Sequence, residues 1–280
     1  MNHLRRRLLS AALAVLLACS LTGLTSCSRN SGSKTNQRQN SGDKTNETVT
    51  LPAAVPAAGI GRIMPEVVEP KNWLICIDPG HGFGDPGTGP GHFSSDDVYE
   101  KDITIVVSNL LKQELEDRGY KVVLTHDGIT MPALGDNNGD GIFSAPYERP
   151  YYINTYIAPD YMVSLHVNAT LNNTSCGANV YYWQTNLKSN EWSEEIGQDI
   201  VDAINEMVET TAVTKLNSPK TMADTNFVIL GETYCAANLV ELGFCTNEVD
   251  AQNMEDPAWQ KSVAAAIATG IDRFFGGMEK

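Results

Sequence analysis

The chain has 280 residues, of which 20 are basic and 34 are acidic, so its formal net charge is −14. An apolar fraction of 42% can fill a sizeable core, which argues against wholesale disorder, and it is too low for a polytopic membrane protein. We expect no nucleic-acid partner, because contacts with phosphates need a basic surface.

The first 26 residues are predicted to be an export signal. Arg5 to Arg7 form a basic start, an almost entirely apolar run follows over Leu8–Leu24, and Thr25-Ser26 leads into Cys27. This order resembles the signal peptide of a bacterial lipoprotein, which implies export, lipidation of Cys27 and a lipid anchor in the cell membrane facing the cell wall. Cys19 fits the cleavage box less well. An uncleaved anchor is the other interpretation, although the run is shorter than the roughly 20 residues of a spanning helix.

Residues 27–70 are predicted to be a flexible tether. They are rich in Ser, Asn, Gln, Thr and Lys, and later in Pro and Ala, with no aromatic residue and no apolar periodicity. About 40 such residues have an r.m.s. reach of roughly 35 Å. The tether would hold the domain of residues 71–280 away from the membrane.

From residue 73 onward, short apolar segments alternate with amphipathic ones. Strands are predicted at 73–77, 121–125, 161–165, 179–184 and 238–242, and helices at 103–115, 192–208 and 256–274. Strands that alternate with helices indicate an α/β fold, here a single domain with a mostly parallel twisted sheet flanked by helices. We expect this domain to be a monomer.

Four side chains near the ends of these elements favour a metal site. His81 and His166 follow or end strands, Glu241 lies in the last strand, and Glu100 precedes the first helix. Sites in open α/β sheets form beyond the carboxyl ends of the strands, so these residues can share one crevice. Two histidines and a glutamate are a ligand set for catalytic zinc, and a further carboxylate can serve as general base. Taken singly, each has a simpler interpretation, such as a hydrogen-bonded loop histidine or a glutamate that complements a helix dipole.

The segments around these residues form four motifs in order. They are Ile77-Asp-Pro-Gly-His-Gly82 with Asp85-Pro86-Gly87, Glu100 with its following helix, Ser164-Leu-His-Val-Asn-Ala169, and Val240-Glu-Leu-Gly-Phe-Cys-Thr-Asn247. Together they resemble the motifs of the zinc-dependent N-acetylmuramoyl-L-alanine amidases. The resemblance runs from Trp73 to Phe275, which is nearly the whole predicted domain.

This resemblance implies both a site and a reaction. His81, Glu100 and His166 would be ligands of one zinc ion, and Glu241 would be the catalytic carboxylate. The implied partner is peptidoglycan, and the bond cut would join the lactyl group of N-acetylmuramic acid to L-alanine of the stem peptide. A zinc-activated water would attack this amide with Glu241 as general base. A cell-wall-binding or regulatory module without catalysis, and a zinc peptidase acting on stem peptides, are the alternatives.

Two residues beside the predicted ligands have two interpretations. Asp78 and Asn168 either orient the ligating histidines or only fix their turns. The chain also departs from the family pattern near the metal. Phe83 stands where a second glycine is usual, which predicts a reshaped loop, and Thr125-His126-Asp127 lacks a structural arginine found in many members. We assign His126 to a surface loop, together with His92.

A polar segment at 136–141 resembles the start of a calcium loop. Asp136, Asn138 and Asp140 place oxygen donors at alternate positions, and Gly141 follows them. Glu148 falls one residue late for the closing ligand. An ordinary Asn- and Gly-rich surface loop is the alternative to a Ca²⁺ site.

The cysteines of the domain show no spacing typical of a zinc site. Cys76 and Cys245 lie in apolar strand contexts and are predicted to be buried thiols. The sequence leaves open whether Cys176 and Cys235 form a disulfide.

The acidity belongs to the predicted domain. From Lys71 onward the chain holds 12 basic and 30 acidic residues, a formal charge of −18. Such a surface should be repelled by anionic lipids and wall polymers, which makes a covalent anchor more useful.

Overall fold

The structure is a computed structural model that describes residues 69–89, 92–93, 95, 97–130, 132, 147–171, 173–183, 188–210, 221–223 and 227–278. All of them belong to one compact unit, Ile63–Lys280. The predicted export signal with Cys19 and Cys27, nearly all of the tether, and the calcium-loop residues Asp136, Asn138 and Asp140 lie outside the described residues. Within the described ranges, no helix is both long enough and apolar enough to cross a membrane.

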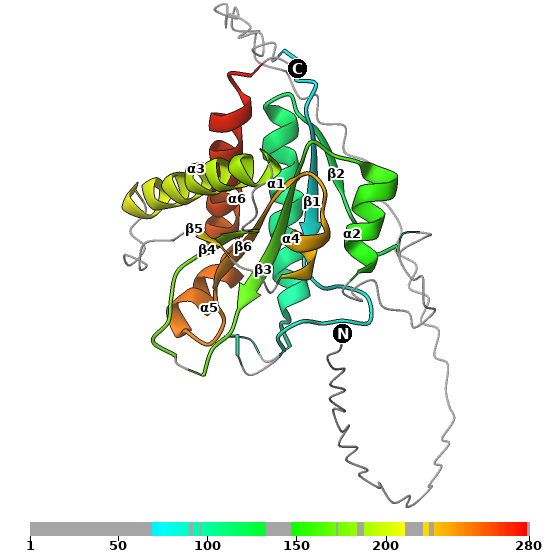
Figure 1. The fold of residues 1–280 in the computed structure, drawn as a ribbon. Coiled ribbons are helices and arrows are strands. Elements are labelled where there is room, and N and C mark those ends of the chain that lie inside the picture. Colours follow the sequence, from blue (N-terminus) through cyan, green and yellow to red (C-terminus); the bar gives the residue numbers. More distant parts are fainter. Residues whose placement is uncertain are drawn as a thin grey trace, which may run out of the picture. The chain divides into compact units, whose positions relative to one another are not determined.

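The described strands form one six-stranded sheet in the order β2-β1-β3-β6-β4-β5 (Figure 1). The strands are Leu74–Pro79 (β1), Lys121–Leu124 (β2), Tyr161–Asn168 (β3), Asn179–Tyr182 (β4), Thr221–Ala223 (β5) and Ala236–Phe244 (β6). Strands β2, β1, β3 and β6 run parallel to one another, β4 is antiparallel to β6, and β5 is parallel to β4. The predicted α/β fold with a mostly parallel sheet is therefore confirmed.

The helices form two unequal layers on this sheet (Figure 1). They are Glu100–Asp117 (α1), Glu148–Tyr152 (α2), the π-helix Ile153–Ile157 (η1), Lys188–Thr210 (α3), Val228–Glu232 (α4), Glu248–Glu255 (α5) and Pro257–Phe275 (α6). The long helices α1, α3 and α6 supply most of the larger core with one face of the sheet, whereas η1 and α4 contribute to a smaller core on the other face. The sequence pattern does not predict the short elements β5, α2, η1, α4 and α5.

The long helices begin and end where local chemistry favours it. The Asp256 side chain accepts a hydrogen bond from the Ala258 N–H at the start of α6, and Pro257 occupies the first turn, where its missing N–H costs nothing. Gly119 follows α1 with a positive φ of 89°, a conformation that glycine adopts without a Cβ clash.

Side-chain alternation along the strands separates the core from the site. Val163 and Leu165 of β3 point into the larger core, whereas Met162 belongs to the smaller one. Since neighbouring residues of a strand face opposite sides, His166 shares the face of Met162. The same alternation in β6 places Glu241 on this face, because its Cα is paired with that of His166. The two polar side chains thus lie on the side that carries the short helices.

Candidate metal centre

Three predicted ligands converge at the carboxyl edge of the sheet. His81, Glu100 and His166 offer ligand atoms that lie within 4.8 Å of one another. Glu100 Oε1 is 3.1 Å from His81 Nε2 and 3.0 Å from His166 Nδ1. Two imidazole nitrogens and one carboxylate oxygen fit a divalent metal ion with a preference for nitrogen and oxygen ligands.

Each of the three comes from a different element. His81 follows β1 and has a left-handed backbone with a φ of 63°, an uncommon conformation for a residue with a Cβ. Glu100 is the first residue of α1, and His166 lies near the end of β3. Parallel strands bring their carboxyl ends together, so a tertiary arrangement assembles a group that is spread over 86 positions of sequence.

Asp85 holds the His81 ring. Its Oδ2 lies 2.8 Å from His81 Nδ1, which leaves Nε2 directed to Glu100. The Gly87 N–H donates to the other oxygen, and the main chains of Gly82 and Asp85 exchange two hydrogen bonds. An outer carboxylate that fixes a histidine in this way is typical of metal sites. This role of Asp85 was not predicted, although its position four residues after His81 was the available clue.

Two glycines leave space for these side chains. A Cβ on Gly80 would lie 2.5 Å from Leu165 O and 2.6 Å from His166 Cε1. A Cβ on Gly87 would lie 2.7 Å from both Glu100 Oε2 and His81 Cδ2. Any larger residue at either position would displace a predicted ligand.

The charge of Glu100 is stabilised from several directions. The Val167 N–H donates to Oε1 and the Thr88 N–H donates to Oε2, each at 2.9 Å. Burial alone would raise the pKa of Glu100, but the bonds to His166 and His81 outweigh it and lower the pKa. Burial opposes a charge on His81 as well, yet the bonds to Glu100 and Asp85 raise its pKa to about 9.

Glu241 lies beside the three predicted ligands, and its pKa is shifted in the opposite direction to that of Glu100. Its residue is 7% exposed, and Oε2 has no hydrogen-bond partner among the described residues. Burial raises the pKa of Glu241 to about 7, and the charge of Glu100 adds to this effect, while His166 and His81 act against it. The site therefore contains one carboxyl group held ionised and another that titrates near neutrality.

Asp78 makes buried contacts around the turn after β1. Asp78 is buried and accepts hydrogen bonds from Thr125 Oγ1 at 2.6 Å, Ser164 Oγ at 2.8 Å and an Arg149 guanidinium nitrogen at 2.9 Å. None of these partners is a ring of His81 or His166. The main-chain carbonyl of Asn168 accepts a hydrogen bond from the Cys245 N–H.

Arg149 connects α2 to the metal-binding turn. Besides Asp78, its guanidinium donates to the main-chain carbonyls of Pro79 and His81. This role of Arg149 was not predicted, because a lone arginine in a short helix gives little local indication of it. The arginine expected near position 126 is absent from that position, and Arg149 supplies a buried guanidinium from another part of the chain.

The assignment of His126 to a surface loop is wrong. The residue is 5% exposed, its Nε2 lies 2.8 Å from Pro79 O, and its Nδ1 accepts a hydrogen bond from the Gly128 N–H. The Phe83 ring packs edge-on against it with centroids 5.3 Å apart, so the two departures from the family pattern touch each other. Burial lowers the pKa of His126, as does the nearby Arg149 charge. His92 is exposed, as expected.

The four described cysteines of the domain form no disulfide bonds. Cys76 and Cys245 are buried, which confirms the prediction, whereas Cys176 and Cys235 are partly buried and form no disulfide.

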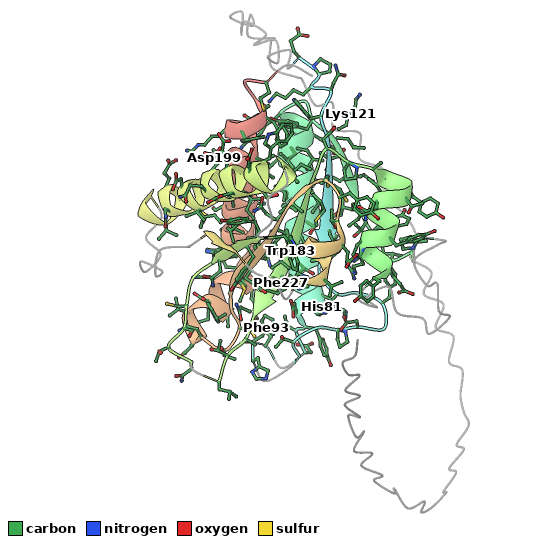
Figure 2. All side chains as sticks on the ribbon, viewed as in Figure 1. His81, Phe93, Lys121, Trp183, Asp199 and Phe227 are labelled. Carbon is green, nitrogen blue, oxygen red and sulfur yellow. The ribbon has the colours of Figure 1, made fainter. Side chains whose placement is uncertain are left out.

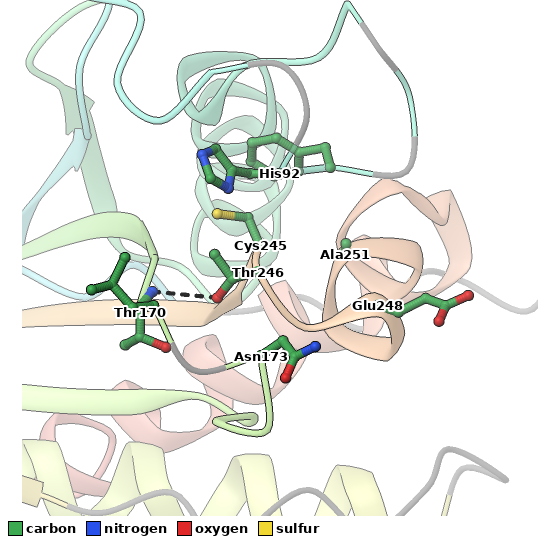
Figure 3. A pocket seen from close by; sticks show the side chains of 9 residues that line it. His92, Thr170, Asn173, Cys245, Thr246, Glu248 and Ala251 are labelled. Atoms are coloured by element: carbon green, nitrogen blue, oxygen red, sulfur yellow. Dashed lines mark hydrogen bonds between the residues drawn. The ribbon is translucent and has the colours of Figure 1, made fainter.

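A pocket of about 460 Å³ adjoins the site (Figure 3). Its walls come from the segments that follow β1, β3 and β6, and Thr170 N–H donates to Thr246 Oγ1 across it at 3.3 Å. The lining residues are His92, Phe93, Thr170, Leu171, Asn173, Cys245, Thr246, Glu248 and Ala251. After burial, the largest influence that raises the pKa of Cys245 is the charge of Glu100, which places this wall close to the metal group.

Fold and site together define a class: an α/β protein with a His-Glu-His metal-binding group and a buried carboxyl group beside it at the carboxyl edge of the sheet. Residues 75–273 match the model of a family described as N-acetylmuramoyl-L-alanine amidase. The chain belongs to this family of cell-wall hydrolases.

Curated relatives and solved structures agree with this family assignment. The germination-specific N-acetylmuramoyl-L-alanine amidase of Bacillus subtilis is 27% identical over 204 residues, which cover 72% of this chain and 79% of that one. The probable cell wall amidase LytH of Staphylococcus epidermidis is 24% identical over 205 residues, and the match spans 73% of this chain and 59% of that longer protein.

Among solved structures, an N-acetylmuramoyl-L-alanine amidase from Clostridium difficile 630 superposes with a TM-score of 0.59 at 26% identity, covering 73% of this chain and 97% of that one. The CwlD amidase of Clostridioides difficile, solved in complex with the GerS lipoprotein, has a TM-score of 0.61 at 24% identity and covers 73% and 99%. At 24% identity, the similarity to the CwlD amidase shows the fold alone.

Proposed function

We propose that this chain is a zinc-dependent amidase that hydrolyses the bond between the lactyl group of N-acetylmuramic acid and L-alanine of the stem peptide. The observation that carries the proposal is the convergence of His81, Glu100 and His166, with Glu241 buried beside them, in a member of this family.

The donor set fits zinc. His81, Glu100 and His166 would hold the ion, and the hydrogen bond between Asp85 and the His81 ring would keep that histidine aligned. When bound, zinc supplies a Lewis acid that polarises a carbonyl and lowers the pKa of water. The glycines at positions 80 and 87 keep the approach to the ligand side chains clear.

Glu241 would move the protons. A carboxyl group with a pKa of about 7 can accept a proton from water near neutral pH and return one to a leaving amine. In the proposed hydrolysis, Glu241 takes a proton from the attacking water and delivers it to the alanine nitrogen as the C–N bond breaks. The unpartnered Oε2 is free for this transfer among the described residues.

The reaction is tested by mass spectrometry of peptidoglycan digests. The zinc-loaded protein should release stem peptides with a new alanine amino terminus, a chelator should abolish the release, and added zinc should restore it. Glu241→Gln should retain zinc and lose turnover by at least about 100-fold, whereas Glu206→Gln on the exposed face of α3 should leave it unchanged. Products cut within the stem peptide would indicate a peptidase. Zinc-dependent wall binding without any product would indicate a binding module.

We also propose export and a lipid anchor at Cys27, supported by the basic and apolar order of the first 27 residues. A radiolabelled fatty acid should be incorporated into the chain in a bacterial host and lost in Cys27→Ser. Persistence of the label in Cys27→Ser and its loss in Cys19→Ser would move the anchor to Cys19.

A further inference from the structure

An aromatic surface on α2 and η1 has no part in the proposed chemistry. Tyr147, Tyr151 and Tyr156 are 64%, 49% and 49% exposed, although tyrosine rings of this size are usually more buried. The rings of Tyr151 and Tyr156 lie edge to face with centroids 6.1 Å apart. We call these three residues the tyrosine face.

The segment that carries the tyrosine face, residues 147–157, has no exposed charged side chain. In residues 147–157 the charged side chains are Glu148 and Arg149, and both residues are only 6% exposed. Tyr147 immediately precedes α2 with a helical backbone, and the Tyr151 N–H donates to its carbonyl. The two residues therefore lie on one side of the helix, about 6 Å apart along its axis. The outward side is therefore aromatic and hydroxyl-bearing.

The backbone that carries the tyrosine face is held in place, and Arg149 joins it to the loop that bears His81. Arg149, between Tyr147 and Tyr151 in sequence, donates to Asp78 and to the main-chain carbonyl of His81. Further along, the Asn154 side chain donates to Glu232 O at 2.7 Å and accepts from the Tyr234 N–H at 2.9 Å. The exposed rings thus sit on a backbone that is fixed at both ends, which lowers the entropy lost when a ligand binds.

The charge of the domain limits what this surface can bind. A domain with a formal charge of −18 repels anionic polymers and lipids, and the tyrosine face offers no cation to offset this. A neutral ligand with apolar C–H faces and hydroxyl groups suits it, because a tyrosine ring stacks through its apolar body and hydrogen-bonds through its O–H.

We propose that the tyrosine face binds the N-acetylhexosamine backbone of a glycan strand beside the bond that is cut. The choice of a glycan rests on the proposed function, since the wall substrate presents that polymer next to the scissile amide. The face would retain the enzyme on insoluble wall and contribute little to the turnover of a short soluble muropeptide.

The test uses N-acetylchitotetraose, a glycan without a stem peptide, and the whole chain carrying Glu241→Gln. Calorimetric titration should detect binding, and Tyr147→Ala with Tyr151→Ala should weaken the affinity roughly tenfold or more, because two stacking rings are lost. Tyr147→Phe with Tyr151→Phe keeps the rings and should retain most of the affinity. Val106→Ala on the exposed side of α1 is the control and should change nothing.

The outcomes separate this proposal from the proposed function. Binding of the tetrasaccharide that is independent of both tyrosines, or no binding at all, would overturn the glycan site even if the chain cleaves soluble muropeptides. Tyrosine-dependent binding would support it even if no amidase product forms. If sedimentation shows dimers that the alanine variant dissociates, while the sugar does not bind, the face is a contact between copies and the proposal is wrong.

Discussion

The charge of Glu100 helps to raise the pKa of two neighbouring groups, His81 and Glu241, and the consequence differs between the two. Burial raises the pKa of Glu241 and the negative charge of Glu100 adds to this, whereas the bonds to Glu100 and Asp85 raise the pKa of His81 against the effect of burial. At neutral pH the imidazole is therefore charged and the Glu241 carboxyl group is partly protonated. A metal ion at His81 would replace the imidazole proton. Glu241 is left as the group whose proton can be exchanged near the working pH.

Glu241 should destabilise the metal-free fold at alkaline pH. Its folded-state pKa of about 7 lies above the ordinary 4.5, so its stabilising contribution is complete below pH 4.5 and is lost as the pH rises through about 7. Metal-free Glu241→Gln should therefore exceed the parent in unfolding free energy by on the order of 2 kcal/mol at about pH 8, and the gain should shrink towards about pH 5. Urea unfolding at both pH values measures it. An equal gain at both pH values would exclude titration of Glu241 as the cause.

The buried pair of Arg149 and Asp78 should be costly to break. Arg149→Met would leave the Asp78 carboxylate buried without its cation, at a cost of about 3–5 kcal/mol in unfolding free energy. Zinc affinity should fall as well, because the guanidinium also holds the His81 carbonyl. Arg273→Met is the matched control, since its bridge to Glu206 is exposed and should contribute less than about 1 kcal/mol. Similar losses of unfolding free energy in Arg149→Met and Arg273→Met would show that burial does not determine how much an ion pair contributes to stability.

At the level of elements, the loop after β1 determines whether the ligands can meet. This loop contains left-handed residues at His81 and Phe83, a tight turn closed by Gly82 and Asp85, and the two glycines that face the ligands. Strained backbone of this kind persists only where the surroundings hold it. Arg149 from α2 and His126 from the segment after β2 supply that support, because both hydrogen-bond to the Pro79 carbonyl.

Gly80→Ala should damage the metal centre without altering any ligand. The added Cβ would lie 2.6 Å from His166 Cε1, so the ring or the loop must shift, and zinc affinity should fall roughly tenfold or more. Overpacking should also lower the unfolding free energy by about 1–3 kcal/mol. Zinc titration and thermal unfolding measure the two effects.

Gly277→Ala provides the control for that substitution. A Cβ at Gly277 meets no atom within 4 Å, so affinity and stability should both stay at the parent level. If Gly80→Ala binds zinc as tightly as this control, the loop is more compliant than its contacts indicate.

For the whole molecule, the chain enters the domain at the end opposite to the metal group. Lys71 pairs with Asp272, its N–H donates to Gly119 O, and the Tyr120 O–H donates to the same aspartate. These contacts precede β1, whereas His81 follows it, and Figure 2 shows His81 far from Lys121 at the start of β2.

The net charge of the domain predicts an unusual salt dependence. At −18, the domain and an anionic wall repel each other, and added salt screens that repulsion. Binding of the Glu241→Gln chain to intact wall should strengthen when the salt concentration rises from about 50 to about 300 mM. Over this range the Debye length falls below about 10 Å, so the repulsion is screened. Pelleting of wall with bound protein measures this, and weaker binding at high salt would contradict the electrostatic argument.

Local pattern predicted the long helices and every described strand except β5, and it made the four residues of the proposed centre candidates for one site. Apolar periodicity extends over many residues in α1, α3 and α6, and the rule that parallel strands meet at one edge brings His81, His166 and Glu241 together. Short elements such as α2 and η1 escaped prediction, because helices of five residues are stable only through tertiary packing.

Tertiary structure alone decided which groups support those residues. His126 stands before Asp127-Gly128, a typical surface turn in sequence, yet it is buried against Pro79 and Phe83. Arg149 reaches Asp78 from 71 positions away. The sequence shows which residue types could bind a metal, and its apolar periodicity shows where the strands and long helices lie. Burial and the pairing of distant charges depend on which segments the packed chain brings into contact, and a linear pattern carries no record of that.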